Sequence, residues 1–388
     1  MKFNVTYGGW YQRTTLHLSE IYDLFVDGKS SLNLSKTELQ KHKKSLNLES
    51  VSRHSDYFEY VKAIEKSGIE IRYYEDGLYV LEMETEDIRE AQKELEKYYQ
   101  EKINPALSYI FSLGAPTPKI LANIKTKHPT VVSVYGIDAN NFSLDEHKFG
   151  KAYSKLNSSG VTVQKTPDYI FIIAPNHTHK SVLNLIEMQI FFREFKDQLE
   201  KYLAIHRTIW EEISEIKEAK TIIGKEVDSV RGKLDGYQKT ISLIGNRINQ
   251  MGSYINTRSS IAKHYDIEKN LIDLFEYKFE TLTDTLSYIK EIWKMTGDYL
   301  SQAVSNLVEI KNQSTSNNLK SLQTITSIGV ISGVLGYLSA NKLPSISVQG
   351  LIYFIILFCL TWLMNAVIAK KYKNKKYSLK FGGNVSNI

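Results

Sequence analysis

Residues 350–369 read GLIYFIILFCLTWLMNAVIA, twenty consecutive residues without a formal charge. At about 1.5 Å per residue, a helix of this length covers the roughly 30 Å hydrocarbon core of a bilayer. A second uncharged stretch, residues 321–341, precedes it, and the polar loop 342–349 separates the two at Pro344. We therefore predict a two-helix transmembrane hairpin, with the pore-helix entry and first span over 311–341 and the second span over 350–369.

The charges next to these stretches predict their orientation. The loop holds one lysine, Lys342, whereas five lysines follow the second stretch, at positions 370, 371, 373, 375 and 376. An excess of lysine marks the cytoplasmic side of a membrane protein. We therefore expect a multi-pass protein of the inner (cell) membrane with both termini cytoplasmic. Its basic tail, residues 370–388, would lie against anionic lipid headgroups.

The charge balance changes along the chain. The 388 residues carry 49 basic and 43 acidic side chains, a net charge of +6. The last acidic residue is Glu309, and residues 310–388 hold nine lysines, so the preceding part has a net charge of about −3. A nucleic-acid-binding domain would carry a basic footprint. We therefore expect no direct nucleic-acid binding by the N-terminal part.

Residues 1–176 have the pattern of a cytoplasmic α/β domain with a mixed sheet. Short apolar or alternating runs bounded by turn residues predict strands at 2–7, 69–74, 78–83, 107–113, 131–135, 161–164 and 169–174. Helical spacing of apolar residues predicts helices at 16–25, 36–66 and 85–100. The turn Glu75-Asp76-Gly77 predicts a hairpin between the second and third of these strands.

Residues 177–310 contain no proline and predict a stalk of long helices. Their apolar residues recur at spacings of three and four in two seams, over 185–216 and 255–300, with a predicted turn within 224–236. Seams of this length indicate helices that pack as a bundle or between subunits. We expect the second helix to run uninterrupted into the first span, so that movement of the stalk would move the span. The alternative is a plain antiparallel coiled-coil spacer. The predicted fold class is α+β, with a mixed-sheet head, a helical stalk and the C-terminal hairpin.

The order of these parts resembles the CorA family of divalent-cation channels. The run Asn318-Leu319-Lys320-Ser321-Leu322 into Thr324-Ile325-Thr326 is similar to the family's Asn-x-x-Met-Lys-x-Leu-Thr entry to the pore helix. The resemblance implies a homo-oligomer, a pentamer in that family. The family's Gly-Met-Asn signature is absent, and Leu338-Ser339-Ala340-Asn341 stands in its place.

The outer loop also departs from the family pattern. In the family, the signature and an acidic loop are thought to hold a hydrated magnesium ion, whereas loop 342–349 contains Lys342 and no carboxylate. A hard dication prefers anionic oxygen ligands, and a ring of lysines would repel it. Proteins that resemble CorA but lack the signature occur among the effectors of type III CRISPR systems.

That branch implies a membrane channel or effector in antiviral defence, switched by a small nucleotide second messenger. One such messenger is an adduct of S-adenosylmethionine with AMP. Two alternatives stay open: a divergent divalent-cation (Mg²⁺) transporter, and a non-conducting, membrane-anchored coiled-coil scaffold.

The N-terminal segment offers candidate ligand-binding residues, Gly8, Gly9, Trp10 and Arg13. A strand followed by two glycines and an arginine could let backbone amides approach a phosphate, and the tryptophan could stack on a base. The alternative is a glycine turn with its aromatic residues in the core.

Candidate pore-lining residues lie along the first span. They are Thr324, Ser332, Gly336, Ser339 and Asn341. Several copies around an axis would line a narrow polar path with these residues. The alternative is close helix packing through small residues, with hydroxyl groups bonded back to the preceding turn.

No catalytic or metal-binding signature accompanies these candidates. The sequence contains no HExxH, Walker loop or GxSxG pattern, and its one cysteine, Cys359, lies in the second span. His177 and His179 could offer imidazoles to a metal, but a surface loop with Thr178 as a helix cap is the favoured interpretation. We therefore expect neither an enzyme nor a bound metal or cofactor.

Overall fold

The computed structural model of this chain describes residues 1–12, 17–55, 57–113, 128–177, 179–218, 221–338 and 348–378. The chain divides into two units. Unit one holds residues 1–205 and 243–293, and unit two holds residues 206–242 and 294–388.

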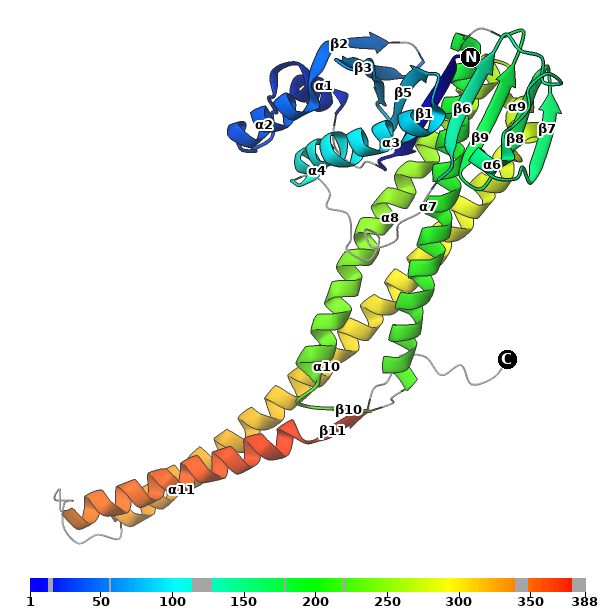
Figure 1. The fold of residues 1–388 in the computed structure, drawn as a ribbon. Coiled ribbons are helices and arrows are strands. Elements are labelled where there is room, and N and C mark those ends of the chain that lie inside the picture. The colour runs from blue at the N-terminus through cyan, green and yellow to red at the C-terminus, as the bar shows by residue number, and fades with distance from the viewer. Residues whose placement is uncertain are drawn as a thin grey trace, which may run out of the picture. The chain divides into compact units, whose positions relative to one another are not determined.

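Within the described part of unit one, nine strands form a mixed sheet (Figure 1). The strands are β1 (Phe3–Trp10), β2 (Leu48–Ser55), β3 (Glu59–Glu65), β4 (Glu70–Tyr74), β5 (Leu78–Thr85), β6 (Thr130–Tyr135), β7 (Ser154–Ser158), β8 (Val161–Lys165) and β9 (Tyr169–Ala174). Their order is β2-β3-β4-β5-β1-β6-β9-β8-β7, and neighbours are antiparallel except β6 and β9, which are parallel. The N-terminal strand β1 therefore lies at the centre of the sheet.

Helices of unit one cover both faces of this sheet. One face shares its hydrophobic core with helices α1 (Leu18–Asp27), α2 (Lys36–Leu46), α3 (Ile88–Tyr98) and α4 (Asn104–Phe111). Side chains of β1 alternate between the faces, so Val5 packs in that core while Trp10 faces the other way. There the Trp10 ring lies 5.1 Å from Phe191, on the first half of α7 (His179–Glu218).

Two further long helices follow α7 along the chain. They are α8 (Val227–His264) and α10 (Phe279–Leu338), with the short α9 (Glu268–Phe275) between them. The second long helix begins later than its apolar seam, because Asp266 and Glu276 adopt left-handed conformations, φ 53° and 60°, that end α8 and α9. From Phe279 to Leu338 it is continuous as α10, so it runs without a break into the residues of the predicted first span, as expected. The predicted turn over 224–236 is also largely helical, since α8 begins at Val227.

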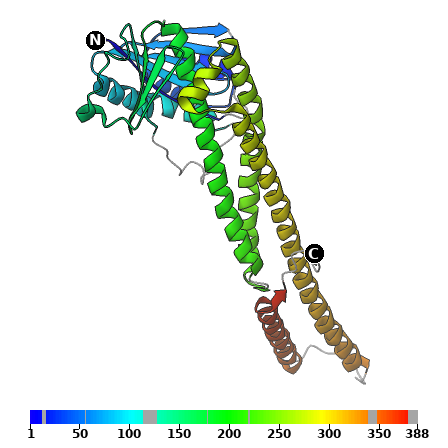
Figure 2. The same cartoon turned by 90° about the vertical axis from the view of Figure 1, so that its right-hand side faces the viewer.

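Unit two contains the C-terminal helix α11 (Val348–Lys373), which runs back along the last part of α10 (Figures 1 and 2). A short strand pair joins β10 (Thr221–Ile223), between α7 and α8, to β11 (Lys376–Ser378), after α11. Backbone hydrogen bonds from Gly224 N to Lys375 O (3.0 Å) and from Lys225 N to Lys373 O (2.9 Å) extend this pairing.

One predicted element of the head has the wrong type, and another is too long. The predicted strand over 107–113 is α4, which begins at Asn104-Pro105, because proline is well suited to a first helical turn. The predicted helix over 36–66 ends as α2 at Leu46, where Asn47 adopts a left-handed conformation with φ 54°, and β2 and β3 follow. The predicted hairpin around Gly77 is confirmed, as β4 and β5.

The predicted α+β class, with an N-terminal mixed sheet and long helices, is confirmed. Across the described residues, no helix combines the length and the apolar character needed to cross a bilayer. The end of the predicted first span (339–341), most of the outer loop (342–347) and most of the tail (379–388) lie outside the described residues.

We predict that Gly9→Ala destabilises the head by about 1–3 kcal/mol, because overpacking a close contact forces buried groups to move. A Cβ at Gly9 would meet the Tyr79 hydroxyl and lie 2.9 Å from its Cζ, and Tyr79 stacks on Tyr99 with ring centroids 4.9 Å apart. Thermal unfolding followed by tryptophan fluorescence measures this. The control is Gly232→Ala on α8, which meets open space and should be neutral or slightly stabilising; equal effects would contradict the prediction.

Candidate functional site

The candidate glycines Gly8 and Gly9 lie inside β1, paired with Val80 and Tyr79 of β5, and not in a turn after the strand. A Cβ on Gly8 would lie 2.8 Å from the Tyr79 carbonyl oxygen and 3.1 Å from Ile190 Cδ1. The expectation of a glycine turn is therefore wrong at this point. The missing side chains instead allow β5 and α7 to approach β1 closely.

Trp10 has a packing role in the structure. Its indole Nε1 donates a 2.7 Å hydrogen bond to the Asp76 carbonyl oxygen, and its ring packs against Phe191 and Phe195. Arg13 lies outside the described residues. Ligand binding by the four candidate residues stays a prediction.

The candidate pore residues that the structure describes lie on α10. The Thr324 hydroxyl donates to the Lys320 carbonyl oxygen at 2.9 Å, and the Ser332 hydroxyl to the Gly329 carbonyl oxygen at 3.4 Å. Gly336 belongs to the same helix, whereas Ser339 and Asn341 lie outside the described residues. Such bonds to the preceding turn are the ones expected for hydroxyl groups in a closely packed helix. Pore lining stays a prediction.

Sequence reasoning missed a cavity of about 280 Å³ in unit one, which we call the head pocket. It lies between strands β3 and β4, the first turns of α7 and the last turns of α8. Its charged lining consists of Lys62, Glu70, Arg72, Lys180, Glu187 and Arg258. Its aromatic lining consists of Tyr57, Phe58, Tyr60, Tyr74 and Tyr265.

A buried ion network forms the floor of the head pocket. The Arg72 guanidinium, 4% exposed, contacts Glu82 at 2.6 Å and Glu187 at 3.0 Å, and also pairs with Glu70. Burial alone would lower the pKa of Arg72, but the charges of Glu187 and Glu82 more than offset this and raise it. Burial raises the pKa of Glu187. Perturbed ionisable groups in a cleft are typical of functional sites.

A second buried pair joins the β4–β5 turn to α8. Asp76 is fully buried, and its carboxylate accepts hydrogen bonds from Arg258 Nε at 2.7 Å and Nη2 at 2.9 Å. The Arg258 guanidinium carbon also lies 4.8 Å from the ring centroid of Phe58 and 4.9 Å from that of Tyr74. Removing one partner of such a pair costs about 3–5 kcal/mol, because it leaves a buried charge uncompensated.

The first residue of α7, His179, connects the ion network to β1. Its Nε2 lies 3.2 Å from a Glu82 carboxylate oxygen, and its Nδ1 lies 2.9 Å from Asn4 Nδ2 and 3.0 Å from the Tyr135 hydroxyl. The hydrogen bond with Glu82 raises the pKa of His179, against the lowering effect of burial. The arrangement fixes the start of α7 to the sheet.

The mouth of the head pocket combines cations with aromatic rings. Lys62 pairs with Glu70 at 2.8 Å, while exposed Lys180 has no carboxylate partner among the described residues. The rings of Tyr60 and Tyr74 pack at a tilt of 31° with centroids 5.0 Å apart, and Tyr57 is 51% exposed. Aromatic faces beside cations suit a ligand with a ring and an anionic group.

The sequence did contain a signal for this site. Arg72 interrupts the apolar run of β4, and Glu187 interrupts a strongly apolar part of α7. Charged residues are almost never fully buried unless they are paired. Two opposite charges in segments expected to be buried therefore pointed to a buried pair, but the partner could not be assigned without the sheet register.

No protein-family model and no curated protein matches this sequence. Among solved structures, the chain is similar to the complete structure of the CorA magnesium transporter from Methanocaldococcus jannaschii. The match has 12% sequence identity and a TM-score of 0.22, and it covers 64% of this chain and 92% of that chain. A likeness of this degree carries no conclusion on the fold, the ligand or a transported ion of this chain. Within the described residues, no group of three or more His, Cys, Asp or Glu side chains could hold a metal ion.

We predict that His179 stabilises the head in a pH-dependent manner. Because the pKa of His179 is raised above its ordinary value of 6.5, its contribution is complete below pH 6.5 and disappears as pH rises through the folded-state pKa. The pKa of Glu82 is lowered, mainly by His179 and Arg72 against the effect of burial, so Glu82 stays charged throughout this window.

The variant His179→Gln should therefore lower the free energy of unfolding by about 0.5–1 kcal/mol at pH 6, and by less at pH 9. The effect is small because the His179 side chain is 42% exposed. Denaturant unfolding at the two pH values measures the difference. His147→Gln, at an exposed position on α6 (Glu146–Phe149), is the matched control and should show no such dependence. A larger loss at pH 9 than at pH 6 would contradict the assignment.

Proposed function

We propose that this chain is a CorA-like, ligand-responsive membrane channel. Its C-terminal helices lie in lipid, and ligand bound in the head pocket shifts α7 and α8. The observation that carries the membrane part is the exposure of apolar side chains around most of the circumference of α11.

Nine large apolar side chains of α11 are between 50% and 66% exposed: Ile352, Ile355, Ile356, Phe358, Leu360, Trp362, Leu363, Met364 and Val367. A helix that is apolar nearly all round belongs either in a protein core or in a membrane. A soluble monomer rarely exposes an apolar surface of this extent. The uncharged stretch 350–369, which the sequence places within α11, has the length that lipid requires.

Ligand control is supported by the connection from the head pocket to α11, which runs through α7, α8 and the β10–β11 strand pair. The head pocket is lined by α7 around Glu187 and by α8 around Arg258, and both helices continue along the chain into unit two. Within unit two, the segment that joins them pairs as β10 with β11, directly after α11. A ligand that changes the separation of α7 and α8 would therefore act on the end of α11. To shift a channel from 1:99 open to closed to 99:1, the ligand must bind the open state about 10⁴-fold more tightly than the closed state.

The lining of the head pocket offers contacts for part of a nucleotide, since a base could stack on the tyrosines and a phosphate could meet Lys180. The resemblance alone implies that this nucleotide is a second messenger of type III CRISPR defence, such as an S-adenosylmethionine–AMP adduct. It also implies a homo-oligomer. In this proposal the head binds its ligand without catalysis, and the pore residues named from the sequence line the path.

The alternatives differ in what the membrane part does. A divergent Mg²⁺ transporter would require a dication to pass the outer loop, which holds Lys342 and no carboxylate. A membrane-anchored scaffold would need no conducting path at all. Neither alternative uses the cationic and aromatic lining of the head pocket.

The lipid location predicts the reactivity of Cys359, the one cysteine of the chain and exposed on α11. In vesicles permeable to a water-soluble maleimide, Cys359 should react at least about tenfold more slowly than a cysteine in water, because thiolate forms poorly in hydrocarbon. The control is Cys359→Ser combined with Lys239→Cys, an exposed site on α8. Equal labelling rates would place α11 in water and end the channel proposal.

Flux measurements test ligand control. We expect the S-adenosylmethionine–AMP adduct to release K⁺ from proteoliposomes, and Lys180→Glu to raise the half-maximal concentration at least about tenfold, because it reverses the charge at the pocket mouth. Lys196→Glu, also exposed on α7 but away from the pocket, should leave the response unchanged. Rapid Mg²⁺ uptake without nucleotide would favour the transporter, and vesicles that stay tight under every condition would favour the scaffold.

A further inference from the structure

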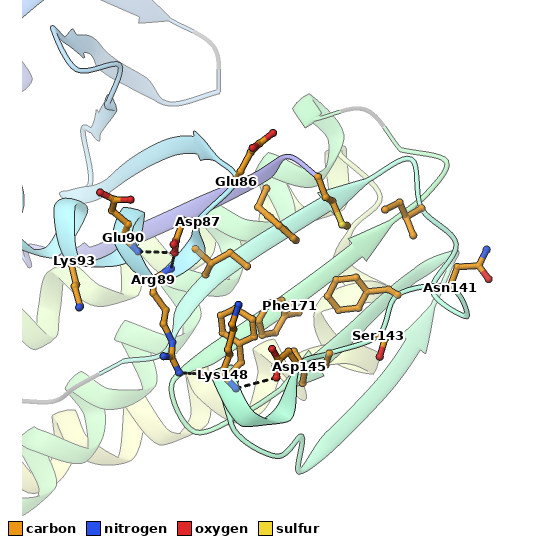
Figure 3. A pocket seen from close by; sticks show the side chains of 17 residues that line it. Glu86, Asp87, Arg89, Glu90, Lys93, Asn141, Ser143, Asp145, Lys148 and Phe171 are labelled. Carbon is orange, nitrogen blue, oxygen red and sulfur yellow. Dashed lines mark hydrogen bonds between the residues drawn. The ribbon is translucent and has the colours of Figure 1, made fainter.

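A larger cavity of about 980 Å³ lies elsewhere in unit one and shares no lining residue with the head pocket. We call it the edge pocket. It lies between the start of α3 and the segment 137–149, over β1 and β9 (Figure 3). Its volume is within the range of ordinary small-molecule sites.

Aromatic rings form the floor of the edge pocket. Phe171 of β9 is fully buried, and its ring lies 5.3 Å from that of Phe149 and 5.9 Å from that of Phe142. Phe142 and Phe149 are half-buried, so each presents part of its ring to the cavity. A planar ring could stack on these faces.

Three cations stand at one side of this floor: Arg89, Lys93 and Lys148. None of them has a carboxylate partner within ion-pair distance among the described residues. The Arg89 guanidinium donates a hydrogen bond to the Lys148 carbonyl oxygen, and its central carbon lies 6.0 Å from the Phe149 ring centroid. The guanidinium is therefore held in place beside the aromatic floor.

The four acidic side chains of the edge pocket either accept hydrogen bonds from backbone amides or point away from the aromatic floor. Asp87 accepts hydrogen bonds from the backbone of Arg89 and Glu90 at the start of α3, and Asp145 accepts from His147 and Lys148 at the start of α6. Figure 3 shows the carboxylates of Glu86 and Glu90 directed away from the Phe171 ring. Arg89, Lys93 and Lys148 are therefore the cations available to a ligand at the aromatic floor, while the carboxylates of Asp87 and Asp145 are already held by backbone amides.

We infer that the edge pocket binds a planar aromatic compound with an anionic substituent. The ring would lie on Phe142 and Phe149, and the phosphate or carboxylate would contact Arg89 and Lys148. Arg89 and Lys148 would each gain an anionic partner, and ion-paired hydrogen bonds of this kind are stronger than neutral ones. This site is separate from the head pocket and does not depend on the proposed channel function.

The test uses the full chain in lipid nanodiscs and equilibrium dialysis with 2-naphthyl phosphate, against empty nanodiscs. We expect saturable binding of one molecule per chain. Binding of 2-naphthol, which lacks the charge, and of inorganic phosphate, which lacks the ring, should be at least about tenfold weaker, because each retains half of the contacts.

The double variant Lys93→Ala, Lys148→Ala should weaken 2-naphthyl phosphate binding at least about tenfold. Both lysines are exposed, so the fold does not depend on them. The matched control is Lys97→Ala, Lys155→Ala, which removes two exposed lysines of unit one outside the edge pocket. Equal binding by the two double variants, tight binding of 2-naphthol, or the absence of saturation would each overturn the assignment. Lys180→Glu should leave this binding unchanged, which separates it from the channel proposal.

Discussion

The buried pair of Asp76 and Arg258 is the contact on which the arrangement of unit one depends. Asp76 lies in the turn between β4 and β5, and Arg258 belongs to α8, so their two hydrogen bonds fix a long helix to this turn of the sheet. The same turn accepts the indole of Trp10, and Arg258 also faces aromatic rings from β4 and α7. Because neither charge has access to water, any movement of α8 must preserve this pair or replace it. The head pocket is built around this constraint.

The neighbouring network of Arg72 extends the constraint to α7. Arg72 on β4 meets Glu82 on β5 and Glu187 on α7, and His179 holds the first turn of α7 to Glu82. Two strands and α7 therefore share one set of buried charges, and α8 contributes the neighbouring pair of Arg258 and Asp76. Buried ionic groups contribute little net stability. They do restrict the protein to those arrangements in which every buried charge is compensated. A ligand that supplies its own charge at the pocket mouth could change which arrangement is preferred.

Local sequence patterns predicted some parts of this fold and not others. The β4–β5 hairpin was predicted because Gly77 supplies the positive φ, 90°, that its turn requires. The end of α2 was missed because Asn47 gives a weaker signal for the same backbone region, and the apolar run of α4 fits a strand as well as a helix. The head pocket was beyond reach, since Arg72, Glu187 and Arg258 are far apart in sequence and meet only through the sheet register and the packing of the long helices.

The pairing of β10 with β11 has a consequence for biosynthesis. β10 emerges early from the ribosome, but its partner strand is made only after α11 is complete. Domains fold in the order of their synthesis, and contacts between distant segments form late. The connection between α7 and α8 therefore stays without its strand partner until both C-terminal helices have left the ribosome. This small ladder can therefore close only after β11 has been made, and a chain cut short before Lys376 cannot form it.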